Sequence, residues 1–115
     1  MKLFARLALP FVLGGAIVSM LSVAFAGSKK PAGAMIFREK CSMCHGLDGK
    51  GYAAIKTPDF TDAKWQAAHG DKELMDAIEN GMKGTAMVSF KGTLDHEQME
   101  AVLKYVRSLG SKAKK

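Results

Sequence analysis

The clearest hydrophobic pattern of the chain lies close to its C-terminus. Apolar side chains recur there about every 3.6 residues, the period of a helix with one buried face: Met99, Val102, Leu103, Val106 and Leu109. Asp95 and Gln98 are spaced as in a capping box, and Leu94 and Met99 occupy the positions of a hydrophobic staple. The pattern predicts a helix that begins after Asp95 and ends at Gly110, because glycine commonly terminates helices.

Two further helices are predicted upstream of this one. From about Gly33 to Cys44 the apolar side chains are broadly spaced as on a helix: Ile36, Phe37 and Met43. A second stretch, residues 72–80, has Asp71 as its expected N-cap and is followed by Gly81. Its apolar stripe consists of Leu74, Met75 and Ile78.

Glycine-rich loops separate these helices. Residues 45–60 contain Gly46, Gly49, Gly51 and Pro58, and residues 81–93 contain Gly81, Gly84 and Gly92. Between them, Thr61 or Asp62 can cap a short helical turn that carries Trp65. No segment reads as part of a sheet and no internal repeat is visible. The predicted fold class is therefore all-α, with three to five helices.

The N-terminal segment has the form of a secretory signal peptide. Lys2 and Arg6 give it a positive start, an apolar run follows, and Ala24-Phe25-Ala26 is a small-x-small cleavage site. Cleavage after Ala26 is the favoured interpretation. The alternative is an uncleaved membrane anchor, because about 20 apolar residues suffice to span a bilayer. Either interpretation predicts an exported, periplasmic protein, free in the first case and membrane-anchored in the second.

Length and charge complete this picture. The 115 residues divide into four predicted parts: signal peptide 1–26, linker 27–32, domain 33–110 and basic tail 111–115. The net charge is +6, but lysines gather at the ends of the exported part and the remaining basic residues are scattered. Without a basic stripe interleaved with aromatics, the sequence gives no indication of nucleic-acid binding.

Cys41, Cys44 and His45 carry the most specific chemical signal. They form Cys-x-x-Cys-His and include both cysteines of the chain. This is the attachment motif of a c-type haem: each thiolate can form a thioether with one vinyl group, and the histidine can bind the iron as proximal ligand. The sequence therefore predicts one covalently bound haem c.

Other interpretations of the two cysteines fit less well. A thioredoxin-like dithiol would follow a strand, and none precedes Cys41. A disulfide between Cys41 and Cys44 would be strained. A zinc site would need two further ligands, whereas His69 and His96 lie far apart along the chain.

The chain resembles class I monohaem cytochromes c, in particular small exported bacterial members. Three segments carry the resemblance, in this order: Gly33-x-x-x-Phe37 before the haem motif, the loop 80–90, and Tyr105 to Leu109. The resemblance implies the class I fold, with the helices wrapped around one covalently attached haem. It also implies that Gly33 and Phe37 pack on the last helix, where we expect Val102 and Tyr105 to meet them.

The second axial ligand is expected to be a methionine. Met35, Met75 and Met99 fall within predicted helices and read as core residues, whereas Met82 and Met87 lie in the glycine-rich loop. The resemblance favours Met87, although Val88 follows it where the family usually has proline.

Two expectations about histidines accompany this assignment. An iron bound by two histidines, through His69 or His96, is the less favoured alternative. The resemblance further suggests that the Pro58 carbonyl accepts a hydrogen bond from His45.

These features predict a single-electron carrier rather than an enzyme. No nucleophile–base pair is apparent, and an iron with two axial protein ligands has no open site for substrate. The expected partners are redox proteins that donate and accept the electron, with the chain itself a monomer. The alternatives are an electron-transfer subunit of a dehydrogenase or oxidase complex, or a ligand-binding or peroxidase-like haem protein if Met87 is labile.

Overall fold

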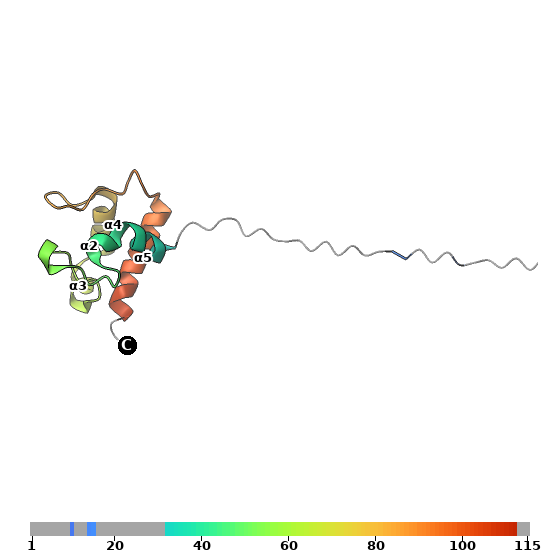
Figure 1. Ribbon diagram of the computed structural model, residues 1–115, viewed down its shortest axis with the longest axis horizontal. Helices are drawn as coiled ribbons and strands as arrows, with labels where there is room; N and C mark the ends of the chain where they lie inside the picture. The colour runs from blue at the N-terminus through green and yellow to red at the C-terminus, as the bar shows by residue number, and fades with distance from the viewer. Residues whose placement is uncertain (1–9, 11–13, 16–31, 113–115) are drawn as a thin grey trace, which may run out of the picture.

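A computed structural model describes residues 10, 14–15 and 32–112 of the chain. The predicted signal peptide and linker lie almost entirely outside this range, as do the last residues of the predicted tail. Within residues 32–112, seven helical elements follow one another (Figure 1): α1 Gly33–Ile36, η1 Phe37–Cys41, α2 Ser42–His45, η2 Ala53–Ile55, α3 Ala63–Ala68, α4 Asp71–Asn80 and α5 His96–Lys112. The described residues contain no strand, which agrees with the predicted all-α class.

The elements α1, η1 and α2 form one helical stretch that covers the predicted Gly33–Cys44 helix and extends to His45. Its middle part, Phe37–Cys41, is a π-helix, which the hydrophobic pattern does not predict. The N–H of Ser42 donates to the carbonyl of Phe37, five residues earlier, and the Ser42 hydroxyl donates to the Arg38 carbonyl at 2.5 Å. A π turn inserts one residue into the helix, and the residues after the turn are therefore rotated relative to those before it.

The C-terminal helix α5 begins as predicted. The Asp95 N–H donates to Gln98 Oε1 at 3.0 Å, and the Gln98 N–H donates to Asp95 Oδ1 at 2.8 Å, which completes the capping box. The apolar face is buried at Met99, Val102, Val106 and Leu109. The predicted end is wrong, because α5 continues through Gly110 to Lys112. The first residues of the predicted tail are therefore helical.

The core is centred on the contact between α1 and α5. A Cβ atom added at Gly33 would lie 2.0 Å from the carbonyl oxygen of Ala101, so only glycine permits this approach. Phe37 and Val102 are each 1% exposed, and the ring centroids of Phe37 and Tyr105 are 5.2 Å apart. The predicted packing of the first helix on the last is thus confirmed. Around it the buried apolar core comprises Ile36, Phe37, Phe60, Ile78, Leu94, Met99, Val102, Val106 and Leu109.

The short helices are joined to this core by polar contacts. Asp62 caps α3 by accepting from the Lys64 N–H at 2.9 Å, which selects it over Thr61. The N-cap of α4 is Gly70, so the prediction of Asp71 as cap is wrong. Asp71 instead starts the helix, and its carboxylate accepts a hydrogen bond from Arg107 Nε of α5 at 2.7 Å. The Asp71 carboxylate therefore binds Arg107 of α5 instead of capping its own helix.

Candidate functional site

The predicted attachment residues lie at the end of the first helical stretch. Cys41 is the last residue of η1, while Cys44 and His45 belong to α2. Gly46 follows with a φ of +78°, which ends the helix and turns the chain away. Both cysteines are free thiols, so the strained disulfide is not formed. The described residues also contain no group of three or more His, Cys, Asp or Glu that could hold a metal ion.

Burial sets the protonation of this segment. It raises the pKa of the Cys41 thiol to about 11, with opposing smaller effects of the neighbouring Lys40 and Cys44 charges. Burial also lowers the pKa of His45, because the charged imidazolium is poorly solvated there. The imidazole is therefore held neutral, the form in which a histidine nitrogen binds a metal.

Aromatic side chains surround the His45 ring. Phe60 stacks on it with centroids 4.7 Å apart and an interplanar angle of 20°, and Phe37 lies 6.4 Å away at 45°. The Nδ1 atom of His45 is buried and has no hydrogen-bond partner. The predicted bond to the Pro58 carbonyl is therefore not formed. The loop instead closes elsewhere, where the Gly51 N–H donates to the His45 carbonyl at 2.8 Å.

Two loops, one after α2 and one after α4, carry exposed apolar side chains. In the view of Figure 1, η2 and the tip of the loop after α4 both lie at the left of the domain, with α5 to their right. Large apolar side chains on these loops are half or more exposed: Leu47, Tyr52, Ile55, Met82 and Val88. Free thiols, a buried unpaired imidazole nitrogen and exposed apolar loops together fit a flat apolar prosthetic group such as haem.

The candidate axial methionines lie in a loop closed by its own hydrogen bonds. We call residues Met82–Met87 the methionine strap. The Met82 N–H donates to the Met87 carbonyl at 3.2 Å. The Thr85 hydroxyl donates to the Met82 carbonyl at 2.8 Å and accepts from the Met87 N–H at 3.2 Å. Met87 is half-buried, whereas Met82 is 52% exposed.

The strap is fixed to α4 at both ends. Gly81, with a φ of +73°, leaves no room for a Cβ atom, which would lie 2.7 Å from the Met87 carbonyl oxygen. On the other side, the Ser89 hydroxyl donates to the Glu79 carbonyl at 2.6 Å and the Phe90 N–H to the Ile78 carbonyl at 3.1 Å. These bonds hold the loop against the C-terminal end of α4.

The alternative histidine ligands are engaged on helix surfaces. His69 Nδ1 lies 2.8 Å from Glu73 Oε1, and its ring contacts Trp65 with centroids 4.5 Å apart. His96 Nε2 lies 3.2 Å from Glu100 Oε1.

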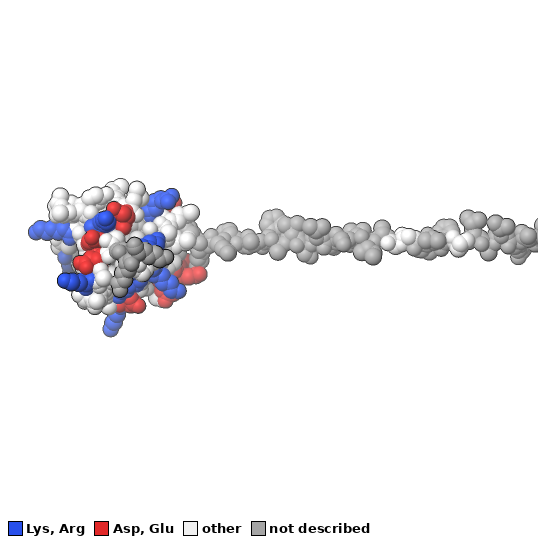
Figure 2. Space-filling view, turned by 90° about the horizontal axis from the view of Figure 1, so that it is seen from below, with Lys and Arg blue, Asp and Glu red and all other residues white. Residues whose placement is uncertain are grey.

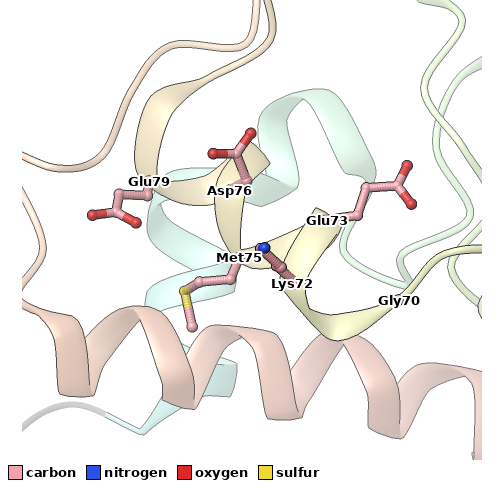
Figure 3. A pocket seen from close by; sticks show the side chains of 6 residues that line it. All are labelled: Gly70, Lys72, Glu73, Met75, Asp76 and Glu79. Atoms are coloured by element: carbon pink, nitrogen blue, oxygen red, sulfur yellow. The ribbon is translucent and has the colours of Figure 1, made fainter.

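A surface hollow of about 670 Å³ on α4 (Figure 3) contains none of the predicted ligands. It is lined by Gly70, Lys72, Glu73, Met75, Asp76 and Glu79.

Sequence reasoning missed three residues that support the site. Phe60 stacks on His45, Gln66 binds the Phe60 carbonyl at 2.7 Å, and Arg107 binds Gln66 Oε1 at 2.8 Å. Phe60 directly follows Pro58-Asp59 in a loop for which the sequence predicts no contact with His45. Gln66 and Arg107 lie 41 residues apart, so no local signal could have paired them.

In the part of the chain that the structure describes, no helix combines the length and apolarity that a membrane span requires.

Known proteins resemble the chain in sequence. FixP, a cbb3-type cytochrome c oxidase subunit of Bradyrhizobium sp. (strain ORS 278), is 38% identical over 73% of this chain and 29% of its own length. The CcoP subunit of Rhodobacter capsulatus is 37% identical over 71% of this chain and 30% of its own length. The chain thus spans less than a third of these curated relatives.

Solved structures resemble the chain in fold. The KustC0563 c-type cytochrome superimposes with a TM-score of 0.64 and 29% identity, covering 69% of this chain and 98% of that one. Cytochrome cL of Methylophaga aminisulfidivorans gives a TM-score of 0.57 and 25% identity, over 71% of this chain and 56% of its own.

The family model described as Cytochrome c matches residues 31–110, which include the haem motif, the methionine strap and most of α5. This family implies haem c as the cofactor, in agreement with the free thiols and the unpaired imidazole nitrogen. The chain belongs to the cytochrome c family.

Proposed function

We propose that the chain is an exported single-electron carrier with one haem c, attached through Cys41 and Cys44. The observation that carries the proposal is the buried, unpaired His45 nitrogen immediately after two free thiols. When bound, the haem supplies an iron that exchanges one electron between Fe(III) and Fe(II). The family match and the relatives' roles in an oxidase support electron transfer as the function.

The residues of the chain divide the work of holding this group. Cys41 and Cys44 tether it, and burial keeps His45 neutral as the proximal ligand. Met87 is the proposed second ligand, because it is half-buried in a strap whose hydrogen bonds fix its backbone. A thioether ligand stabilises the ferrous state and raises the reduction potential. With His45 and Met87 as its two ligands from the chain, the iron would have no open position for a substrate, which supports the role of a carrier.

The attachment can be tested by mass and extraction. The exported protein should exceed its polypeptide mass by one haem, which should survive acid–acetone treatment. The Cys41→Ala and Cys44→Ala double variant is expected to lose the haem under the same treatment. A haem that washes out of the wild-type protein would contradict covalent attachment.

The axial assignment can be tested with two matched methionine variants. Met87→Ala should abolish the weak absorption of His–Met ligation near the red end of the visible spectrum and lower the reduction potential. Met82→Ala, in the same strap, should leave both unchanged because Met82 is exposed. The opposite pattern would assign the ligand to Met82.

A second candidate function follows from the relatives. FixP and CcoP are subunits of cbb3-type oxidases, so the chain can also be proposed as the electron-transfer part of a membrane-bound complex. Purification from the native periplasm and from native membranes separates the two proposals. A free carrier is expected in the soluble periplasmic fraction as a monomer, and a subunit in the membranes together with oxidase or dehydrogenase subunits.

A further inference from the structure

The orientation of the His45 ring is fixed by packing. Its Nδ1 atom makes no hydrogen bond, so no polar partner limits rotation of the ring about the Cβ–Cγ bond. The stacked Phe60 ring, 4.7 Å away and inclined by only 20°, covers one face of the imidazole. Phe37 touches the same ring at a wider distance and a steeper angle. Phe60 is therefore the contact that best defines the imidazole plane.

Phe60 is itself held by a ring contact and by hydrogen bonds of its backbone. Its ring is 7% exposed and also contacts Trp65, with centroids 4.9 Å apart. Its backbone N–H donates to the Gly49 carbonyl at 2.8 Å, within the loop that follows the haem motif. Its backbone carbonyl accepts a hydrogen bond from Gln66 Nε2 at 2.7 Å. Both ends of the residue are thus tied to neighbouring segments.

Gln66 connects Phe60 to the C-terminal helix. The same Nε2 atom donates to the Val106 carbonyl at 3.0 Å, and Oε1 accepts from Arg107 Nη1 at 2.8 Å. All hydrogen-bonding atoms of this side chain amide point to named partners on Phe60 or α5. Gly110 makes room for it, since a Cβ atom there would lie 2.6 Å from Gln66 Cγ. The Gln66 side-chain amide therefore links Phe60, which stacks on His45, to α5.

We propose that Phe60 is the positioning residue of the proximal His45, and that Gln66 fixes Phe60 through its backbone carbonyl. Together they set the plane of the imidazole relative to the haem. The inference rests on the proposed function, because it concerns His45 as an iron ligand. In a ferric haem the orientation of the axial imidazole plane governs how unpaired spin is distributed over the four haem methyl groups.

The test uses NMR of the ferric protein with cyanide added. Cyanide replaces the methionine sulfur and, being linear, has no plane of its own, so the spread of haem-methyl shifts reports the imidazole alone. Phe60→Leu removes the stacked ring but keeps an apolar side chain. Gln66→Met removes the amide hydrogen bonds to Phe60 and α5 but keeps the length of the side chain. Both variants are expected to change the spread or order of the methyl resonances. Phe60→Tyr, which keeps the aromatic ring, is expected to show the wild-type pattern.

Tyr105→Leu is the control. It removes an aromatic ring from the same part of the core, but the ring contact of Tyr105 is with Phe37. We expect it to lower stability and leave the methyl pattern unchanged. Folded Phe60→Leu and Gln66→Met proteins with the wild-type pattern would overturn the inference, as would an equal change in Tyr105→Leu.

The inference and the proposed function fail in different ways. A wild-type protein that does not retain haem covalently, or whose His45→Ala variant keeps the wild-type ferric spectrum, would overturn both. If the protein retains haem covalently but its methyl pattern is the same in the Phe60 and Gln66 variants, the positioning role is overturned and the proposed electron-carrier function is not affected.

Discussion

The contact between α1 and α5 and the methionine strap are built in opposite ways. The first joins distant parts of the chain through side chains that are almost fully buried, Phe37 and Val102 among them. The second is closed by hydrogen bonds between neighbouring residues and leaves Met82, and Val88 next to the strap, exposed. Stability is distributed unevenly in proteins, and segments with few buried contacts open first. The His45 side of the site is therefore specified by the protein core, whereas the strap is held by exposed hydrogen bonds and is expected to open first.

The largest effect is expected from Phe37→Ala. The ring is 1% exposed and touches Tyr105, Phe60 and His45, so its loss leaves a cavity in the α1–α5 contact. We expect a loss of about 3–5 kcal/mol in the free energy of unfolding. Chemical denaturation of the holoprotein measures it. An unchanged midpoint would show that this contact does not support the fold.

Gly33→Ala tests the same contact without removing an apolar group. The added methyl would meet the Ala101 carbonyl oxygen, a backbone atom that cannot move alone, and should cost about 3 kcal/mol of stability. Gly92→Ala is the matched control, because a Cβ atom there meets nothing within 4 Å. Equal stabilities of the two variants would argue against the close approach.

Gly110→Ala should reverse the usual sign of a glycine substitution within a helix. Alanine normally stabilises a helix interior by about 1 kcal/mol relative to glycine. Here the methyl would press on Gln66 Cγ, and we expect a net destabilisation on the order of 1 kcal/mol. In a Gln66→Ala background the obstacle is absent, so the same substitution should become stabilising. Thermal unfolding of the four proteins decides this.

Thr85→Val sharpens the contrast at the strap. It keeps the shape of the side chain and removes the two hydroxyl hydrogen bonds that link Met82 and Met87. Because the site is exposed, we expect a global loss below about 1 kcal/mol. The absorption of His–Met ligation should nevertheless disappear at a lower temperature than in wild type. Loss of that absorption only together with global unfolding would contradict an independently opening strap.

The smallest effect concerns surface charge at the two loops. Lys50 lies on the loop after α2 and Lys83 on the loop after α4, whereas the Lys91 ammonium lies 4.0 Å from a Glu79 carboxylate oxygen and is partly neutralised. Figure 2 shows basic and acidic side chains interspersed on the face in view, without a single-sign patch.

Reversing both charges, in Lys50→Glu with Lys83→Glu, should slow oxidation of the ferrous protein by the anion ferricyanide and flatten its salt dependence. The effect should fade as the Debye length falls to about 8 Å at physiological salt. Lys64→Glu with Lys104→Glu, exposed on α3 and α5, gives the same change of net charge and serves as control. Equal rates in the two double variants would leave the loop lysines without a steering role.

Features fixed by local patterns could be predicted from the sequence. The capping box of Asp95 and Gln98 locates the start of α5, and the 3.6-residue period identifies its buried face. Haem attachment at Cys41 and Cys44 stays a prediction, which rests on the spacing of the motif because that spacing is itself the chemical requirement. The α1–α5 contact could also be predicted, through the resemblance of Gly33 and Phe37 to the family pattern, and the structure confirms it.

Features decided by distant contacts could not be predicted. Gly110 looks like a helix terminator, but it serves to admit Gln66 from α3. Asp71 looks like a cap, but its carboxylate is bound by Arg107, 36 residues later. The π turn at Phe37–Cys41 has no signature in the hydrophobic pattern. At Gly110 and Asp71 a partner remote in sequence determines the local conformation, so the local rule gives the wrong answer.

The packing of α1 on α5 determines when the chain can complete its fold during synthesis. Gly33 meets Ala101, near the opposite end of the domain, so a chain that stops before α5 lacks four of the nine buried core residues. Residues 41–45 precede α5 in the chain by about half of the domain. If haem is attached there as proposed, a chain truncated before α5 would keep the attachment residues but could not bury the attached group.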